Sequence, residues 1–127
     1  MAELIMGFDF GTSKIGVAVG QKITASATPI GKVNATDGKP DWSQLDMIVG
    51  EWQPCLFVVG LPLNMDDSKN DITRAAERFG KRLVGRYKIP FEMIDERLST
   101  FEAKQNQTQD VDATAARLIL ETWLSQA

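Results

Sequence analysis

The chain has 127 residues, with 14 Lys and Arg against 17 Asp and Glu, a formal net charge of −3, one Cys and no His. The lack of His excludes Ser-His-Asp and Cys-His nucleophiles and histidine metal ligands, and a single Cys excludes an internal disulfide or a cysteine zinc site. Acid–base or metal chemistry must therefore use carboxylates, Lys, Tyr or hydroxyl groups.

One globular domain spanning residues 1–127 is expected, because the chain shows no repeat, linker or low-complexity tract and has an ordinary apolar content of 43%. The N-terminal apolar run is too short for a signal peptide, and no stretch is long enough for a membrane span. We therefore expect a cytoplasmic protein with no membrane partner.

The first third of the chain predicts strands. Apolar runs at 4–10 and 15–19 are separated by a short turn, which predicts an antiparallel hairpin, and the alternating segment 24–30 predicts a third strand. Residues 34–40 contain Asp37-Gly38 and Pro40 and are typical of a loop.

Strands then alternate with helices. Asp41 is a candidate helix N-cap, with Gln44 at the spacing of a capping box, and apolar residues recur at helical spacing up to Trp52. Cys55 precedes the continuous apolar run 56–59, which is typical of a buried central strand, so we expect the thiol in the core. Further along, we expect a helix over 71–87, a strand over 91–94, a helix starting at Ser99 and a last helix over 112–124.

The resulting order is β-β-β-α-β-α-β-α-α. Three strands joined by short turns and followed by alternating strands and helices predict an α/β protein with a mixed five-stranded sheet and helices packed on it. This is the order of the ribonuclease H-like fold.

Three acidic positions are candidates for chemistry. Asp9 lies in an apolar strand between Phe8 and Phe10, where a carboxylate is costly to bury unless something compensates it. Asp95-Glu96 directly follows a strand, and only one of two successive strand residues faces a given side. Asp112 begins the last helix, where an Asp is also common as a cap.

Each position alone also fits a structural role, but three converging carboxylates would repel one another. Mg²⁺ or Mn²⁺, as one or two ions, would neutralise that charge, and such ions activate water for attack on a phosphodiester without any histidine. The sequence therefore predicts a metal-dependent nuclease.

A basic stripe is the second feature. Residues 74–88 hold six Lys or Arg and one Glu in an otherwise acidic chain. Helical spacing predicts an apolar face and an opposite basic face; the apolar one is formed by Ile72, Ala76, Phe79 and Leu83, and the basic one by Arg74, Arg78, Lys81 and Arg82. Such a stripe is either a solvated helix face or a surface that contacts a phosphate backbone.

Several blocks resemble the signature motifs of the YqgF (RuvX) family. They are Phe8-Asp9-Phe10-Gly11-Thr12, Gly16-Val17-Ala18-Val19-Gly20, Val59-Gly60-Leu61-Pro62-Leu63-Asn64, Asp95-Glu96-Arg97-Leu98-Ser99-Thr100 and Val111-Asp112-Ala113-Thr114-Ala115-Ala116. The resemblance covers almost the whole chain. The segment 104–110 is shorter than the matching loop of the family.

The resemblance implies a ribonuclease H-like nuclease related to RuvC Holliday-junction resolvases, with a role in maturing the 5′ end of precursor 16S ribosomal RNA. The family's acidic positions fall on Asp9, on Glu96 in preference to Asp95, and on Asp112. Lys14 and Arg97 are candidates to contact the scissile phosphate, or to pair with the carboxylates. The expected partners are precursor ribosomal RNA, the pre-ribosomal particle or branched DNA, and the chain is expected to be a monomer or weak homodimer.

Other functions fit some of these residues. A four-way junction resolvase would use the same carboxylates in a two-fold dimer. A nucleic-acid-binding module without catalysis would need only the basic stripe. Asp9-Phe10-Gly11-Thr12 also fits a phosphate loop, although a nucleotide cleft of that kind requires two such domains.

Overall fold

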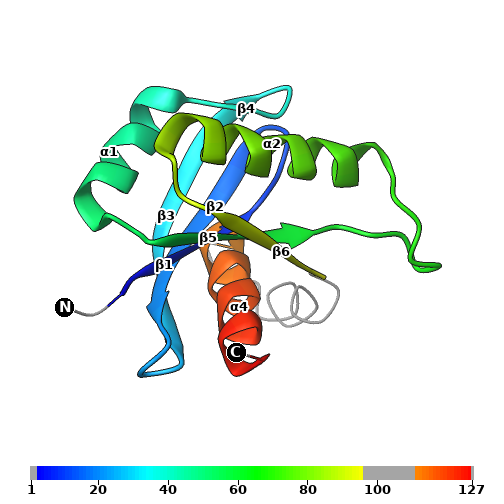
Figure 1. Ribbon diagram of the computed structural model, residues 1–127. Helices are drawn as coiled ribbons and strands as arrows, with labels where there is room; N and C mark the ends of the chain where they lie inside the picture. The colour runs from blue at the N-terminus through cyan, green and yellow to red at the C-terminus, as the bar shows by residue number, and fades with distance from the viewer. Residues whose placement is uncertain (1–2, 96–110, 127) are drawn as a thin grey trace.

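The computed structural model describes residues 3–95 and 111–126, which form a mixed sheet with helices on both faces (Figure 1). The strands are β1 (Ile5–Asp9), β2 (Lys14–Gln21), β3 (Ser26–Thr36), β4 (Lys39–Pro40), β5 (Leu56–Leu61) and β6 (Phe91–Asp95). The helices are α1 (Trp42–Trp52), α2 (Asp71–Tyr87) and α4 (Val111–Gln126). The helix expected from Ser99 lies outside the described residues.

The strand order across the sheet is β4-β3-β2-β1-β5-β6. Neighbouring strands from β1 to β4 are antiparallel, whereas β1, β5 and β6 are parallel to one another. The mixed sheet and its helices confirm the predicted α/β class.

The prediction of five strands was wrong, because the described residues form six. β3 continues to Thr36, and the segment expected to be a loop holds its end together with β4. Asp37 and Gly38 connect them with positive φ angles of 52° and 80°. Two such residues are what a tight hairpin turn requires, so the Asp-Gly pair marks a hairpin.

Both predicted helix starts carry a cap. The Asp41 side chain accepts hydrogen bonds from the backbone N–H groups of Ser43 and Gln44 at the start of α1. Gln44 does not complete the predicted capping box, because its side-chain oxygen accepts from the backbone N–H of Asn34 in β3. This bond ties α1 to the sheet instead.

In α2, Asn70 and Thr73 form a reciprocal capping box. Thr73 is fully buried, and its hydroxyl also donates to the carbonyl oxygen of Pro62. Ile72 was wrongly predicted to lie on the buried face and is 40% exposed. It occupies the first turn, where Thr73 supplies the inward-facing residue.

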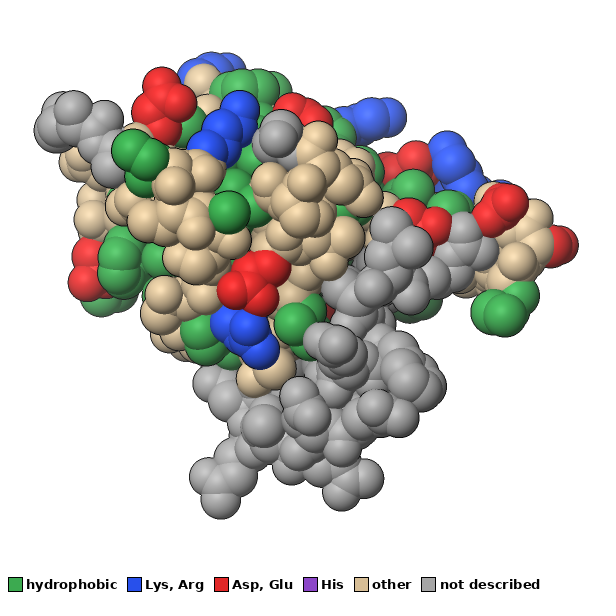
Figure 2. All heavy atoms as spheres, turned by 90° about the horizontal axis from the view of Figure 1, so that it is seen from below, with side chains coloured by type: hydrophobic (Ala, Val, Ile, Leu, Met, Phe, Trp, Pro, Cys, Tyr) green, Lys and Arg blue, Asp and Glu red, His purple; other side chains and the backbone are tan. Residues whose placement is uncertain are grey.

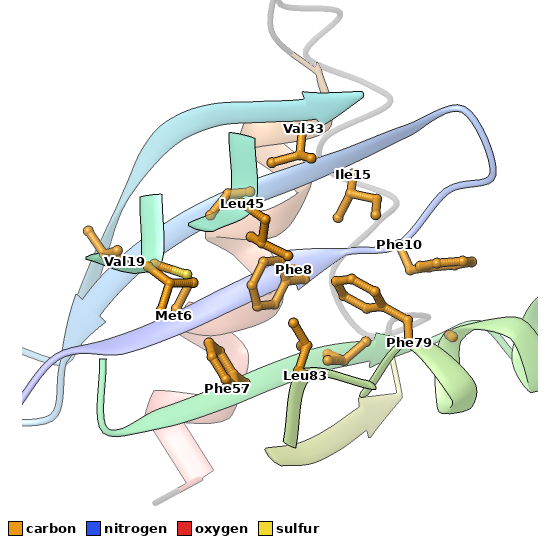
Figure 3. Packing of buried hydrophobic residues seen from close by; sticks show 14 residues of the cluster. Met6, Phe8, Phe10, Ile15, Val19, Val33, Leu45, Phe57, Phe79 and Leu83 are labelled. Atoms are coloured by element: carbon orange, nitrogen blue, oxygen red, sulfur yellow. The ribbon is translucent and has the colours of Figure 1, made fainter. Parts of the chain in front are cut away.

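The main core lies between the sheet and the two helices α1 and α2 (Figure 3). Phe8 of β1 packs edge to face on Phe79 of α2, with ring centroids 5.3 Å apart, and contacts Phe57 of β5 at 5.7 Å. Full burial of these rings fixes the position of α2 over the centre of the sheet.

A second core lies between the other face of the sheet and α4, as Figure 1 shows. It contains Ile5, Val58, Ile94 and Leu120. Cys55 belongs to neither core: it is exposed, which contradicts the expectation of a buried thiol. The strand begins only at Leu56, so Cys55 lies in the bend before it.

Among residues 3–95 and 111–126, no helix has the length and apolar character that crossing a bilayer requires.

Candidate nuclease site

Two of the candidate carboxylates end parallel strands at the same edge of the sheet. Asp9 is the last residue of β1, and Asp95 is the last residue of β6, where it pairs with Leu61 of β5. Both are half-buried. Because β1, β5 and β6 are parallel, their carboxyl ends form one edge, the usual position of sites in such sheets.

Strand alternation places the two side chains on different faces. In β6, Ile94 packs in the α4 core and Met93 against the opposite core, so Asp95 lies on the α1 and α2 side. In β1, Ile5 and Gly7 face α4, so Asp9 lies on the α4 side. Asp9 and Asp95 therefore do not converge on one point.

The packing of glycines sets the direction of α4. A Cβ atom at Gly7 would lie 2.8 Å from the Cβ atom of Leu120, and one at Gly20 would lie 3.1 Å from Leu124. Gly20 pairs with Ile5, the first residue of β1. Moving from residue 120 to 124 along α4 therefore leads back towards the start of β1, and α4 runs opposite to β1.

This direction brings the start of α4 to the end of β1. Asp112 precedes Ala116 by one helical turn, about 6 Å, while Asp9 follows Gly7 by about 7 Å of strand. Since Ala116 lies against Gly7, the two offsets point the same way. Asp112, in the first turn of α4, is thus brought by the backbone to the end of the sheet that carries Asp9.

A lysine pair shares the face of Asp9. Asp9 pairs with Gly16 of β2, and Gly16 pairs with Lys32 of β3, so these residues form one cross-strand row. Two strand spacings separate Asp9 from Lys32, about 10 Å. Lys14 precedes Gly16 by two residues on the same face, and both lysines are exposed. Lys32 was missed in the sequence because only the register of β3 reveals it.

The remaining predicted residues of this site, Glu96 and Arg97, lie outside the described residues. Within the described side chains, no three His, Cys, Asp or Glu residues form a group that could hold a metal ion. Asp9 is the described oxygen ligand on the α4 side of this edge.

The predicted basic stripe is on the outer side of α2. Arg74, Arg78, Lys81 and Arg82 are all exposed, and Phe79 and Leu83 on the opposite side are buried in the core. Arg74 is 3.5 Å from Asp71 on the same helix.

Arg86, four residues beyond Arg82, is bound within the protein. Its guanidinium donates two hydrogen bonds to Asp46 of α1, at 2.8 and 2.7 Å, and lies 4.8 Å from the ring centroid of Trp42. The hydrogen bond from Arg86, followed by one from the Tyr87 hydroxyl, lowers the pKa of Asp46 to about 2. The Arg86 pKa is raised by the same carboxylate, and the pKa of Tyr87 is raised by burial and by Asp46. Arg86 therefore joins α1 to α2.

A family model provides the identification. The model of the RuvX family, described as Holliday junction resolvase, matches residues 3–126. The chain belongs to the RuvX family. This confirms the resemblance inferred from the sequence motifs and extends it over nearly all of the chain.

Curated relatives in the RuvX family match at high identity, and each bears the name "Putative pre-16S rRNA nuclease". The relative from Nitrosococcus oceani is 48% identical over 133 residues, covering 98% of this chain and 88% of the relative. The relative from Azotobacter vinelandii is 49% identical over 134 residues, with 98% and 94% covered. The family and these relatives identify the chain as a nuclease, a hydrolase of phosphodiester bonds.

Two solved structures share the fold at low sequence identity. Thermus thermophilus RuvC, in complex with a Holliday junction substrate, superimposes with a TM-score of 0.57 at 13% identity, covering 98% of this chain and 94% of RuvC. The fowlpox virus resolvase, in complex with Holliday junction DNA, gives 0.58 at 10% identity, with 97% of each chain covered. These neighbours confirm the predicted ribonuclease H-like fold.

Proposed function

We propose that this RuvX nuclease cleaves precursor 16S ribosomal RNA at its 5′ end, using Asp9, Glu96 and Asp112 with Mg²⁺ or Mn²⁺. The observation that carries the proposal is the approach of the start of α4 to Asp9 at the carboxyl edge of the parallel strands. The names of the curated relatives support the choice of RNA substrate.

The donor set suits a hard divalent cation. The proposed ligands carry only carboxylate oxygens, and Mg²⁺ and Mn²⁺ prefer oxygen. Asp9, half-buried at a strand end, would hold the ion together with Glu96 and Asp112. When bound, such an ion lowers the pKa of water for attack on a phosphate and stabilises the leaving oxygen.

Strand alternation favours Glu96 over Asp95 as the ligand from the third strand. Asp95 belongs to the face of the sheet opposite to Asp9, so its carboxylate would have to reach around the strand. In the proposed site Asp95 is therefore an outer residue that supports the ligands.

The lysines near Asp9 would attract the substrate. Lys14 and Lys32 add two positive charges to the face that carries Asp9, where the scissile phosphate would lie. Arg97 is proposed as a further contact. We propose that the enzyme acts as a monomer or weak homodimer in the cytoplasm, where precursor ribosomal RNA and the pre-ribosomal particle are its partners.

The test compares two substrates. Purified protein is incubated with an RNA spanning the precursor 16S 5′ end and with a synthetic four-way DNA junction, each in Mg²⁺, in Mn²⁺ and in EDTA. We expect metal-dependent cleavage of the RNA, abolished by EDTA and by Asp9→Asn. Asp71→Asn is the matched control, because its carboxylate is fully exposed at the start of α2, and it should retain wild-type cleavage.

The outcomes separate the candidate functions. Paired symmetric cuts in the DNA junction, without cleavage of the RNA, would establish the resolvase function that the family description names. Binding of either substrate without cleavage would indicate a nucleic-acid-binding module. Wild-type cleavage by the Asp9→Asn variant would disprove the proposed site.

A further inference from the structure

The outer side of α2 presents basic side chains that make no contact explaining their presence. Arg78, Lys81 and Arg82, together with Lys88 at the C-cap, are exposed and take part in no hydrogen bond or ion pair with the described residues. This distinguishes them from Arg86, which is held by Asp46. We call Arg78, Lys81, Arg82, Gly85 and Lys88 the outer α2 surface.

The like charges on this surface are unfavourable for the isolated helix. Arg78 and Arg82 are four residues apart on one helix, where like charges repel. Glu77 does not neutralise them, because it pairs with Lys69 at 2.8 Å. The stripe is therefore better explained by an external anion than by the stability of α2.

Gly85 lies in the middle of this surface. At 100° per residue, it falls between Lys81 and Arg82 around the helix and continues the row that starts at Arg78. Nothing lies within 4 Å of a Cβ atom built at Gly85, so packing does not require a glycine there. A glycine in a helix interior costs about 1 kcal/mol relative to alanine. Its effect here is a low, flat point that lets a large anion approach the helix closely.

The position of the surface separates it from the chemistry. α2 covers the face of the sheet opposite to α4, whereas Asp9 lies on the α4 side (Figure 1). Figure 2 views the molecule from below, the side on which α4 lies, and the charged side chains of described residues visible there are scattered rather than gathered in a basic patch. The outer α2 surface cannot therefore touch the same phosphate as Asp9.

The two sites are nevertheless connected by the fold. β5 runs parallel to β1, and α2 begins after the loop that follows β5, so the first turns of α2 lie at the edge that carries Asp9. From Arg78 to Lys88 the helix rises about 15 Å, which matches roughly four nucleotides of one strand at 3.4 Å each. A substrate entering at Asp9 could continue along α2.

We propose that the outer α2 surface is a docking site for the sugar-phosphate backbone of double-helical RNA beyond the cleavage point. The proposal rests on the proposed function, since it concerns the same substrate. The surface carries charge and no aromatic side chain, which favours backbone contacts over stacking with unpaired bases. It positions the RNA without reading its sequence.

The first experiment measures binding without cleavage. Fluorescence anisotropy follows a labelled RNA duplex of roughly 16 base pairs, long enough to span the surface, over a range of salt concentrations. The Arg78→Gln/Arg82→Gln variant should bind at least about tenfold more weakly at low salt. The slope of log affinity against log salt should fall by about 1.4 to 1.8, because two phosphate contacts are lost.

Two controls account for net charge. Lys22→Gln/Ile23→Glu changes the net charge by the same amount at the turn between β2 and β3, at the opposite end of the sheet from Asp9, and should bind like wild type. Gly85→Glu places a carboxylate within the surface, and Gly50→Glu places one on α1. Neither glycine has a neighbour within 4 Å of its Cβ position, so both variants should fold. Only Gly85→Glu should weaken binding.

The outcomes are distinct from those of the nuclease test. Equal weakening by Gly85→Glu and Gly50→Glu, or an unchanged salt slope in Arg78→Gln/Arg82→Gln, would overturn the docking site. Stronger binding of anionic lipid vesicles than of the duplex would also overturn it. If wild type binds the duplex through α2 but cuts no precursor RNA, the proposed function fails and the docking site stands. If it cuts and the variants keep the wild-type KM, only the docking site fails.

Discussion

Gly7 of β1 and Leu120 of α4 are in direct contact, so close that a Cβ atom at residue 7 would lie 2.8 Å from the Cβ atom of Leu120. This contact is what lets α4 lie flat on β1 and brings its first turn to the end of the strand. The candidate site therefore depends on a glycine that carries no functional group.

Gly7→Ala should damage both stability and cleavage. The added methyl group overlaps a fully buried leucine, and overpacking of this kind destabilises a protein by about 1 to 3 kcal/mol. To relieve the overlap, α4 must move away from β1, and Asp112 moves with it. We expect a lower midpoint in chemical denaturation and a reduced kcat on precursor RNA. Leu120→Ala in the Gly7→Ala background should restore part of the activity, and no rescue would argue that α4 does not position the site.

A second prediction concerns acid stability. Arg86 and Tyr87 lower the pKa of Asp46 from its ordinary value of 3.8 to about 2 in the folded protein. Because the folded pKa is depressed, this interaction stabilises the fold fully above about pH 4, and the stabilisation is lost as the pH falls towards 2. Asp46→Asn should therefore lower Tm at pH 7 and have little effect at pH 2.

The matched control for Asp46→Asn is Asp37→Asn at the turn between β3 and β4. Asn is tolerated at the positive φ of residue 37, so its Tm should follow wild type at both pH values. A constant Tm difference between Asp46→Asn and wild type from pH 7 to pH 2 would contradict the assigned pKa.

Local sequence patterns predicted the parts of the fold that depend on neighbours along the chain. The helix over 71–87 was predicted with its observed bounds, because its apolar face and a break at each end are local features. Asp41 was likewise recognised as a cap. The hairpin of β3 and β4 was missed, because Gly31, Lys32 and Asn34 interrupt the apolar alternation that signals a strand.

Relationships between distant residues could not be predicted in the same way. Arg86 is held by Asp46, which lies 40 residues earlier, so its spacing on α2 did not reveal that it is unavailable to a ligand. The opposite faces of Asp9 and Asp95 follow from which core each strand residue joins. Sequence spacing showed only that one of Asp95 and Glu96 could join Asp9, and the packing of Ile94 favours Glu96.

The helix glycines give a third prediction, in which two similar substitutions have opposite signs. Gly50 of α1 is exposed with open space around its Cβ position, so Gly50→Ala should stabilise the protein by about 0.5 to 1 kcal/mol. Gly80 of α2 is buried against the ring of Phe91, and a Cβ atom there overlaps the ring. Gly80→Ala should destabilise by about 1 to 3 kcal/mol. Urea denaturation of both variants checks this, and stabilisation by Gly80→Ala would show that α2 is free to shift.

The last prediction concerns Lys32, which shares a cross-strand row with Asp9 through Gly16. A positive charge about 10 Å from the proposed scissile phosphate attracts it by roughly 1 kcal/mol at an effective dielectric constant between those of protein and water. Lys32→Gln should therefore lower kcat/KM for precursor RNA by about three- to tenfold at low salt, with little effect at high salt where the charge is screened. Lys22→Gln, at the opposite end of the sheet, is the control and should cleave like wild type. A loss in Lys32→Gln that persists at high salt would contradict long-range attraction and would instead indicate that Lys32 touches the substrate directly.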